Sequence, residues 1–378
     1  MTTRVLQADV TVIGSGIIGQ SIALEARSVG LRVAVLQKPR TGAGSPAAGG
    51  MLSPAGEAFD SEQSLINLAN ESCRIYPEFI QKVESLSGLK AGYQTDGTLM
   101  IALTRDHVGE LEQLGEAQRA RGLHTKWIQP QALKQIEPNL SPRQCGGLLA
   151  SDDHQVNPAL LNKALLKANQ NSGTLFIPYS SKIELEQTSG IASGVLLEDH
   201  PLYDRIESPW VVSADGAWSH EIRALAHLPL RPVRGQYVRL KGSQLINHVI
   251  RTPDVYMIPR ENGVLYLGAS MEEAGFDHTP LAGHSMELLW HAFRAVPGIY
   301  ELEILETAVG FRPALRDNLP AIGPTNIPGL LTAFGHYRHG MMLAPITAAA
   351  ILEILQSNRV PELLSSLSPT RFNDESSV

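Results

Sequence analysis

Cysteine and charge are both scarce in this sequence, and each scarcity excludes a class of protein. Only Cys73 and Cys145 occur among 378 residues, with no Cys-x-x-Cys pair and no Cys/His cluster at metal-ligand spacing. A disulfide framework is therefore excluded, no metal site is expected, and a cytoplasmic location is predicted. Charged residues amount to 18% and the net charge is -7, with Lys and Arg scattered along the chain. Because this pattern lacks the basic patch that nucleic-acid binding requires, no nucleic acid is expected as a partner.

Long apolar runs are missing as well. No stretch of about 18 apolar residues occurs, and the opening MTTRVLQADVTVIG lacks the charged and then apolar order of a signal peptide. We therefore expect no membrane span. Hydrophobic residues nevertheless make up 43% of the chain, which is typical of a well-packed globular protein. The length suffices for two domains, or for one large domain with an insertion.

A strand–helix–strand pattern opens the chain. Residues 8–14 predict a buried strand that ends in glycines, residues 17–29 have helical periodicity, and residues 31–37 form a second apolar strand. Together they make one βαβ unit. A strand followed by a helix is predicted again over 208–222 and over 330–357, so this α/β character is present at the start, the middle and the end of the chain.

Two β-rich regions interrupt the α/β pattern. Residues 92–103 predict a pair of strands around the turn Asp96-Gly97, and residues 233–311 contain short strands joined by turns, with one helix near 285–296. Further helices are predicted over 62–86, 105–122 and 158–171.

The interruptions predict an α/β fold in which a discontinuous Rossmann-like domain contains an inserted antiparallel-sheet substrate domain. No internal repeat or low-complexity tract occurs. The expected limits are 1–90, 146–230 and 306–365 for the Rossmann-like domain, 91–145 and 231–305 for the substrate domain, and 366–378 for a loose tail.

The turn after the first strand carries the motif Gly14-Ser15-Gly16-Ile17-Ile18-Gly19. Gly14 allows the tight turn, Gly16 lets the backbone approach a pyrophosphate, and Gly19 lets helix and strand pack closely. The helix N-terminus at Ile17 and Ile18 offers N–H groups and a partial positive charge to the phosphates. The alternative is a glycine-rich turn without a ligand. Within a complete βαβ unit, a dinucleotide site is favoured.

One part of this motif is missing at the end of the second strand. An Asp or Glu is expected there to bind the ribose hydroxyl groups, but the sequence has Gln37 followed by Lys38. The Gln37 amide can still accept a hydrogen bond, although it lacks the charge that strengthens one. Weaker retention of the cofactor is the resulting hypothesis. Lys38 also keeps open the alternative that the site binds the 2′-phosphate of NADP.

Segments spread over nearly the whole chain resemble one enzyme family. They are VTVIGSGIIGQSIA, GSPAAGGMLSPAGEA, VVSADGAWS, VYMIPRENGVLYLGASME, VGFRPALRDNLPAIGP and GHYRHGMMLAPITA. On these motifs the chain resembles the D-amino-acid-oxidase-like FAD oxidoreductases, and within them the glycine-oxidase branch that serves thiamine biosynthesis. The resemblance implies FAD as cofactor. Because Cys73 and Cys145 match no attachment position of the family, non-covalent binding is expected.

The resemblance also assigns cofactor-binding positions beyond the glycine motif. The small-residue loop GSPAAGGM is where the family brings backbone close to the flavin, although Pro46 stands where relatives usually have Ser or Thr. Asp215-Gly216-Ala217-Trp218 resembles the second dinucleotide contact. The implied contacts are Ser45, Ala47, Ala48, Gly49, Gly50, Met51, Ala214, Gly216, Trp218, Arg312, His336, Tyr337, Arg338, His339, Gly340 and Met341.

Five of the resembling residues are expected at the substrate. Arg312 matches the arginine that holds a substrate carboxylate by two parallel hydrogen bonds, and Tyr256 matches a tyrosine that assists it. Arg338 is expected on the substrate side or at the flavin edge, and Met51 and Met271 match positions that narrow the pocket. Taken without the resemblance, the alternatives are a surface residue for Arg312, a core tyrosine for Tyr256 and core residues for the two methionines.

The resulting functional expectation is FAD-dependent oxidative deamination of a small amino acid. Glycine, sarcosine or a small D-amino acid would give a keto acid, ammonia and hydrogen peroxide, with dioxygen as co-substrate and the chain as a homo-oligomer. Two alternatives remain open. One is a D-amino-acid dehydrogenase of the same fold with another electron acceptor, and the other is a non-catalytic protein that binds FAD or NADP.

Overall fold

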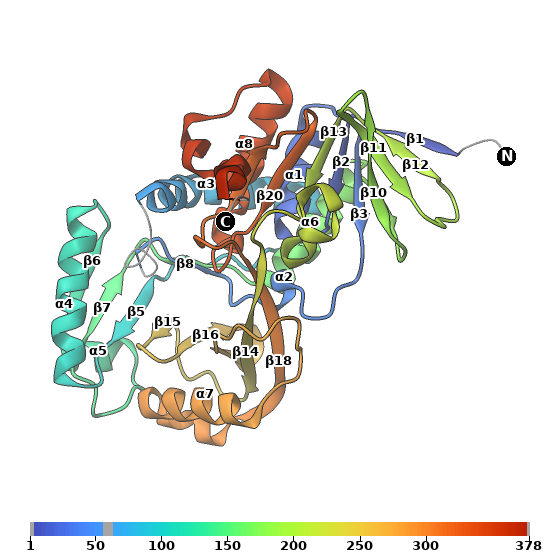
Figure 1. The fold of residues 1–378 in the computed structure, drawn as a ribbon. Coiled ribbons are helices and arrows are strands. Elements are labelled where there is room, and N and C mark those ends of the chain that lie inside the picture. The colour runs from blue at the N-terminus through green and yellow to red at the C-terminus, as the bar shows by residue number, and fades with distance from the viewer. Residues whose placement is uncertain (1–3, 56–62, 376–378) are drawn as a thin grey trace.

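The computed structural model describes residues 4–55 and 63–375, and a six-stranded sheet lies at the centre of its first layer (Figure 1). All its strands are parallel except the edge strand β19 (Ala321–Pro324), which is antiparallel to its neighbour β20 (Leu330–Phe334). Across the sheet follow β13 (Trp210–Ser213), β2 (Val10–Ile13), β3 (Val33–Gln37) and β9 (Leu175–Pro178). The predicted βαβ unit, β2–α1–β3 with α1 at Ile17–Ser28, is confirmed.

Both faces of this sheet are covered, which explains why its strands are continuously apolar. Val10, Val12 and Val35 face one core, whereas Ala34 and Leu36 face another. The helices α1, α3 (Gln63–Ser87), α6 (Pro158–Asn171) and α8 (Gly340–Ser357) cover the first face. On the second face packs a four-stranded sheet of β1 (Val5–Gln7), β12 (Arg205–Glu207), β11 (Ile191–Leu197) and β10 (Ile183–Thr188).

The helix α8 is a core helix. In length and hydropathy it is the one helix within residues 4–55 and 63–375 that could cross a membrane. Most of it is buried, however, because it packs between α1 and α3 in the first core. Burial inside the protein accounts for its composition without a lipid environment.

A second, eight-stranded sheet forms the second layer. The helix α7 (Ala282–Ala295) covers one face of this sheet. The order of the strands confirms the predicted inserted sheet. Contrary to the prediction it is mixed rather than antiparallel, because β15 and β5 run parallel. Its strands, in spatial order, are β18 (Glu303–Ala314), β14 (Arg231–Lys241), β17 (Val264–Gly268), β16 (Tyr256–Arg260), β15 (Val249–Arg251), β5 (Thr98–Ile101), β7 (Gly147–Ala150) and β6 (Thr125–Ile128). The remaining helices of this layer are α4 (Arg105–Ala120) and α5 (Pro130–Ile136).

One local prediction is wrong. The residues before Asp96-Gly97 do not pair with those after it, because Gln94 bridges to Gln155 while β5 pairs with β7 and β15. The helix predicted after β13 is present as a 3-10 helix, η1 (Gly216–Glu221).

The predicted division of the chain also needs correction. β7 and residues 306–314 of β18 lie in ranges assigned to the Rossmann-like domain, yet both strands belong to the eight-stranded sheet. The supposedly loose tail is packed as far as the structure describes its side chains. Leu367 and Phe372 are buried in the two cores, and Arg371 forms an ion pair with Asp317 at 2.8 Å.

Candidate active site

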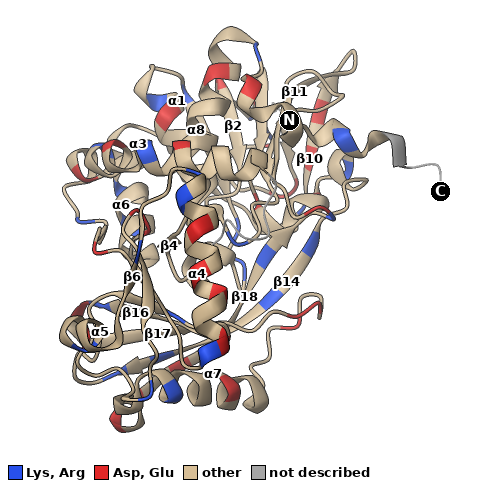
Figure 2. Cartoon of the chain, turned by 90° about the vertical axis from the view of Figure 1, so that its left-hand side faces the viewer, with Lys and Arg blue, Asp and Glu red and all other residues tan. Residues whose placement is uncertain are grey.

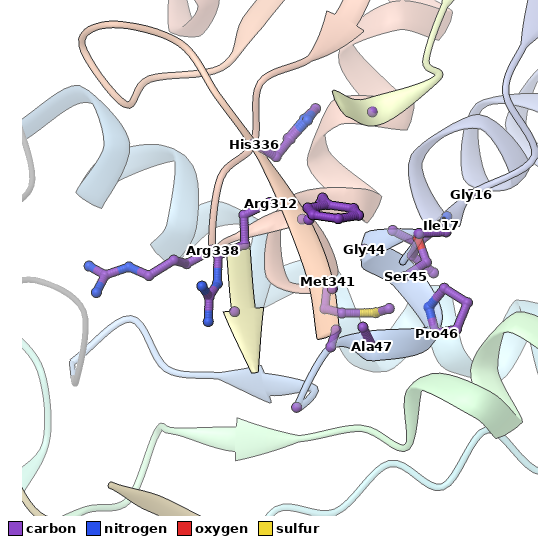
Figure 3. A pocket seen from close by; sticks show the side chains of 18 of the residues that line it. Gly16, Ile17, Gly44, Ser45, Pro46, Ala47, Arg312, His336, Arg338 and Met341 are labelled. Carbon is purple, nitrogen blue, oxygen red and sulfur yellow. Dashed lines mark hydrogen bonds between the residues drawn. The ribbon is translucent and has the colours of Figure 1, made fainter. Parts of the chain in front are cut away.

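A cavity of about 930 Å³ lies where the two sheets meet. This is the upper end of the size range for small-molecule sites. At one end Arg312, His336 and Arg338 reach it from β18 and from the β20–α8 connection, and at the other end lie Gly16, Ile17 and Ser45 (Figure 3). Of the predicted site residues, all line this cavity except Gly14, Gly19 and Gln37.

Gly14 and Gly19 lie behind the cavity wall, where they let backbones approach. Gly14 has a φ of +108°, and a Cβ there would lie 2.5 Å from Ala214 O of the adjacent strand. A Cβ on Gly19 would lie 1.9 Å from Gly14 O, so α1 could not pack so closely on its turn. Both glycines therefore shape the turn that presents the start of α1 to the cavity.

The start of α1 is capped by a residue from another loop. The N-cap Gly16 has no side chain, but Ser45 Oγ accepts a hydrogen bond from Ile17 N–H at 2.9 Å. Ser45 belongs to the short helix α2 (Gly44–Ala47), which packs on β18. This contact joins the glycine-rich turn before α1 to the small-residue loop. The start of α1 after Ile17 remains at the cavity, where its N–H groups can face a ligand.

The small-residue loop is fixed from the eight-stranded sheet. The Tyr266 hydroxyl donates to Ala47 O at 2.8 Å, and the buried Arg260 guanidinium donates to Gly49 O and, at 2.8 Å, to Gln155 Oε1. Burial lowers the pKa of Arg260 to about 10, so it remains a cation at neutral pH. A Cβ on Gly49 would lie 2.8 Å from the Ile258 side chain, so a larger residue would displace the loop.

An ion pair that the sequence did not reveal also lines the cavity. Arg40, three residues after β3, contacts Asp215 at 2.7 Å and Glu221 at 2.7 Å and lies over the Trp218 ring. Burial raises the pKa of the Asp215 carboxyl, and the Arg40 charge opposes that rise. Gln37 ends β3 outside the cavity lining, whereas Lys38 lines it. The pair thus ties the loop after β3 to the turn after β13.

Arg312 lies on β18 with its guanidinium held against β14. Its Nη1 donates to Arg234 O at 3.2 Å and to Ser270 O at 3.1 Å. Gly235 lies next to it, and a Cβ at that position would lie 2.4 Å from Arg312 Nη1. No carboxylate of the described chain forms an ion pair with Arg312, and its side chain lines the cavity. A guanidinium fixed on one side by two carbonyl groups can bind an anion on the other.

Aromatic residues form the floor beside Arg312. The Tyr256 and Tyr266 rings lie nearly parallel, with centroids 6.2 Å apart, and both line the cavity. Tyr256 is placed over Gly268, its partner on β17, where a Cβ would lie 2.4 Å from the Tyr256 hydroxyl. Met51 packs against the same cluster. The Tyr256 side chain therefore lies at the cavity surface and not in the core of the sheet.

Met271 and Tyr337 form the rim. The Tyr337 hydroxyl lies 2.7 Å from Met271 Sδ, and the Arg338 guanidinium lies 5.3 Å from the Tyr337 ring centroid. Met271 is largely exposed, so it flanks the mouth of the cavity and is not a core methionine. Tyr337 has a φ of +48°, an uncommon conformation for a tyrosine, in the connection between β20 and α8.

His336 and His339 are structural residues rather than an acid–base pair. His336 is buried, and its Nε2 lies 3.0 Å from Thr347 Oγ1 within α8. Burial lowers the pKa of His336 to about 3, so its ring is neutral at physiological pH. His339 is the N-cap residue of α8. The His336 ring therefore ties the connection to α8, and the N-terminus of α8 lies at the cavity with its partial positive charge.

The glycines that line the cavity test whether a flavin dinucleotide fits. A Cβ at Gly216 would meet no protein atom within 4 Å, and one at Gly340 only a single atom at 3.8 Å, so both positions leave room for a ligand to approach the backbone. With the N-termini of α1 and α8 both at the cavity, the residues fit a flavin dinucleotide: Gly16 and the start of α1 would hold its pyrophosphate, and the start of α8 would stabilise negative charge on its ring.

Comparison with known proteins agrees with this geometry. The FAD dependent oxidoreductase family, DAO, matches residues 9–354. The chain is 32% identical over 377 residues to the bifunctional protein ThiO/ThiG of Trichormus variabilis, covering 98% of this chain but only 56% of that relative. It is 29% identical to the glycine oxidase of Geobacillus kaustophilus, over 96% of this chain and 97% of the relative. It is also 25% identical to the hydrogen cyanide synthase subunit HcnC of Pseudomonas aeruginosa, over 97% of each chain.

The fold comparison points the same way. The crystal structure of the Geobacillus kaustophilus glycine oxidase superposes with a TM-score of 0.87 at 28% identity, covering 97% of this chain and 99% of that one. Both comparisons extend over the Rossmann-like layer and the inserted sheet together. The chain therefore belongs to the family of FAD-dependent oxidoreductases related to D-amino-acid oxidase.

Proposed function

We propose that the protein oxidises glycine, or an amine of similar size such as sarcosine or a small D-amino acid, to the corresponding imine. Water then hydrolyses the imine to a 2-oxo acid and ammonia, or methylamine where the substrate is sarcosine, and dioxygen is reduced to hydrogen peroxide. The observation that carries this proposal is the placement of Arg312, a cation held by two carbonyl groups at the cavity end nearest the α8 N-terminus.

The proposed roles follow from the positions of the side chains. Arg312 binds the substrate carboxylate, and Tyr256, on the neighbouring floor, donates a hydrogen bond to the same group. Fixing the carboxylate orients Cα and lowers the entropic cost of reaching a reactive geometry. When bound, FAD accepts two electrons and a proton from Cα and passes electrons to dioxygen. The N-terminus of α8 favours negative charge on whatever lies against it.

The substrate must be small because side chains close the pocket around Arg312. Met51 packs on the tyrosine cluster, and Met271 with Tyr337 flanks the mouth. One methyl group in such a pocket changes selectivity by about 1–3 kcal/mol, so glycine, sarcosine and D-alanine are expected to differ by roughly 10- to 200-fold in kcat/KM. We propose glycine as the preferred substrate.

A role in thiamine biosynthesis is part of the proposal. It rests on the similarity to ThiO/ThiG proteins, of which the chain spans about half the length. The second candidate is a D-amino-acid dehydrogenase of the same fold with an electron acceptor other than dioxygen, since the relatives also include proteins that are not named as oxidases, such as the hydrogen cyanide synthase subunit HcnC.

The test begins with the absorbance spectrum of the purified protein. Bound flavin is expected, and its visible band should bleach when glycine, and more weakly sarcosine or D-alanine, is added without oxygen. Peroxide should form when air is admitted; bleaching without peroxide would favour the second candidate.

An arginine variant completes the test. Arg312→Ala should keep the flavin but raise KM for glycine by about 100-fold or more, since a charged, two-hydrogen-bond contact is lost. Exposed Arg223, far along the chain in η2 (Arg223–Leu225), gives the matched control Arg223→Ala, which should leave KM unchanged. Unchanged kinetics in Arg312→Ala would contradict the proposal.

A further inference from the structure

The outer face of α7 carries large apolar side chains that nothing in the described chain covers. Met286, Trp290 and Phe293 follow one another at helical spacing and are 69%, 58% and 37% exposed. Tyr300, 80% exposed in the following turn, extends the row, with the Trp290–Phe293 and Phe293–Tyr300 ring centroids each 6.3 Å apart. We call Met286, Trp290, Phe293 and Tyr300 the α7 face.

The fold itself does not require these residues. The inner side of α7, with Leu288, Ala292 and Ala295, already fills the core beneath the eight-stranded sheet. α7 is also the outermost element of that layer, at the edge of the molecule farthest from the six-stranded sheet (Figure 1). A contiguous exposed apolar patch of aromatic residues on a surface helix marks an interaction surface.

We propose that the α7 face is a two-fold interface on which a second copy of this chain docks. Glu287 and Arg294 lie on the exposed side of the helix and flank Trp290 on either side along its axis. Glu287 also contacts His284 of its own helix at 3.3 Å. In an antiparallel pair of α7 helices related by a two-fold axis beside Trp290, each Glu287 faces the Arg294 of the other copy. Both positions lie about 3.5 residues from the axis, which is about 5 Å along the helix.

This arrangement is self-complementary in both shape and charge. The Trp290 rings meet at the centre of the interface, where aromatic residues contribute most of the binding energy. Two Glu–Arg pairs form at its rim and fix the antiparallel direction. In a parallel arrangement, each Glu287 would face the Glu287 of the other copy and each Arg294 the other Arg294, and the like charges would repel.

The residues around the α7 face argue against a membrane surface or an added strand as its occupant. A helix that binds a membrane surface flanks its apolar stripe with several Lys or Arg residues, but α7 contains only Arg294. On the side of the molecule that includes α3, α4 and α7, acidic and basic residues are interspersed and form no basic face (Figure 2). The nearby edge strand β18 also exposes Ile304 and Leu305, but its bulge opposite Arg239–Leu240 interrupts the edge and makes it poorly suited to extending a sheet with another chain.

Sedimentation velocity on the flavin-loaded protein tests the interface. The wild type should sediment as a dimer or a multiple of it, and Trp290→Glu should raise the dissociation constant by about 100-fold or more. Leu202, 64% exposed on the turn between β11 and β12, gives the matched control Leu202→Glu, which should keep the wild-type assembly. The visible flavin spectrum and far-ultraviolet circular dichroism report that each variant is folded.

A charge exchange identifies the two-fold arrangement itself. Glu287→Arg alone and Arg294→Glu alone should each weaken association, because like charges then face each other. The double variant should restore it, because the pair re-forms with its signs reversed. If Trp290→Glu does not fold, Trp290→Cys should cross-link between copies under mild oxidation, whereas Leu202→Cys should not.

Three results would overturn the proposal. The wild type could sediment as a monomer at tens of micromolar, Trp290→Glu could retain the wild-type assembly, or Trp290→Cys could fail to cross-link. Binding of a monomeric wild type to phosphatidylethanolamine–phosphatidylglycerol vesicles, lost in Trp290→Glu, would instead identify a membrane surface as the occupant.

Discussion

Gly235 lies directly against the guanidinium group of Arg312, so close that a Cβ at position 235 would lie 2.4 Å from Nη1 and 2.5 Å from Cζ. The two residues are diagonal neighbours on β14 and β18, because Gly235 pairs with Gly310 and Arg312 pairs with Val233. The glycine therefore decides where the guanidinium of Arg312 can lie. A glycine within a strand often marks the close approach of another group, and here that group is the proposed carboxylate anchor.

Gly235→Ala is expected to raise KM for the amino-acid substrate by roughly 10- to 100-fold, which corresponds to about 1.4–2.7 kcal/mol, because the added methyl group displaces Arg312. Flavin binding should be unchanged, since Gly235 lies at the substrate end of the cavity. Steady-state kinetics and a flavin titration measure both quantities. Gly109→Ala is the control, because a Cβ at Gly109 in α4 meets nothing within 4 Å. Wild-type KM in Gly235→Ala would show that the guanidinium position does not matter.

The Arg40–Asp215 pair is expected to stabilise the cofactor end of the site. Both side chains are nearly buried, so Arg40→Met leaves the Asp215 carboxylate without its closest cation and should cost about 2–3 kcal/mol of unfolding free energy. Asp215→Asn should cost less, because Glu221 still neutralises Arg40. Chemical denaturation and the flavin dissociation constant measure the effect.

The double variant Arg40→Met/Asp215→Asn separates pairing from packing. It should recover most of the stability lost in Arg40→Met, because no buried charge then lacks a partner. If the double variant is as unstable as Arg40→Met, the arginine acts through its packing on Trp218 instead.

The buried His336 predicts how stability depends on pH. Burial lowers its pKa from the usual value near 6.5 to about 3, so below pH 6.5 the unfolded chain binds a proton that the folded protein does not. The stability from this residue is complete above pH 6.5 and declines as the pH falls towards 3, by about 1.4 kcal/mol per pH unit.

Urea denaturation at about pH 6.5 and about pH 5 measures this decline. Between those pH values the unfolding free energy of the wild type should fall by about 2 kcal/mol more than that of His336→Gln, because glutamine at position 336 does not titrate. His124→Gln, at an exposed histidine, should behave as the wild type does. Equal pH slopes for wild type and His336→Gln would mean that His336 is protonated in the folded protein.

Local patterns predicted the elements whose shape is set by their own residues. The βαβ unit, α3, α4, α6 and α8 are explained by apolar spacing and by glycines at turns, and the turn at Gly97 is real. The sequence could not show that Gln94 bridges to Gln155 or that β5 lies parallel to β15, since those pairings join distant segments. Phe372 could not be placed in the core for the same reason.

The same distinction holds within the candidate site. Motif residues such as Gly16 and Arg312 could be predicted because the residues next to them in the sequence form a recognisable motif. Gly235 and the Arg40–Asp215 pair were missed because their partners are 77 and 175 residues away along the chain. Gly235, inside the otherwise regular strand RPVRGQYVRLK, indicates that another group approaches the backbone closely. The sequence alone does not identify that group as Arg312.

Gln37 gives the last prediction. It ends β3 where dinucleotide-binding proteins place an acid, and it lies outside the cavity lining while its neighbour Lys38 lies within it. Gln37→Glu should lower the flavin dissociation constant by about 5- to 10-fold, because a charged acceptor strengthens a hydrogen bond from the ribose by roughly 1 kcal/mol. Fluorescence titration of the flavin-free protein measures it. Gln187→Glu makes the same charge change on exposed β10 and should have no effect. An unchanged constant in Gln37→Glu would mean that the ribose lies nearer Lys38 and the cavity wall, and that the amide at position 37 does not limit cofactor retention.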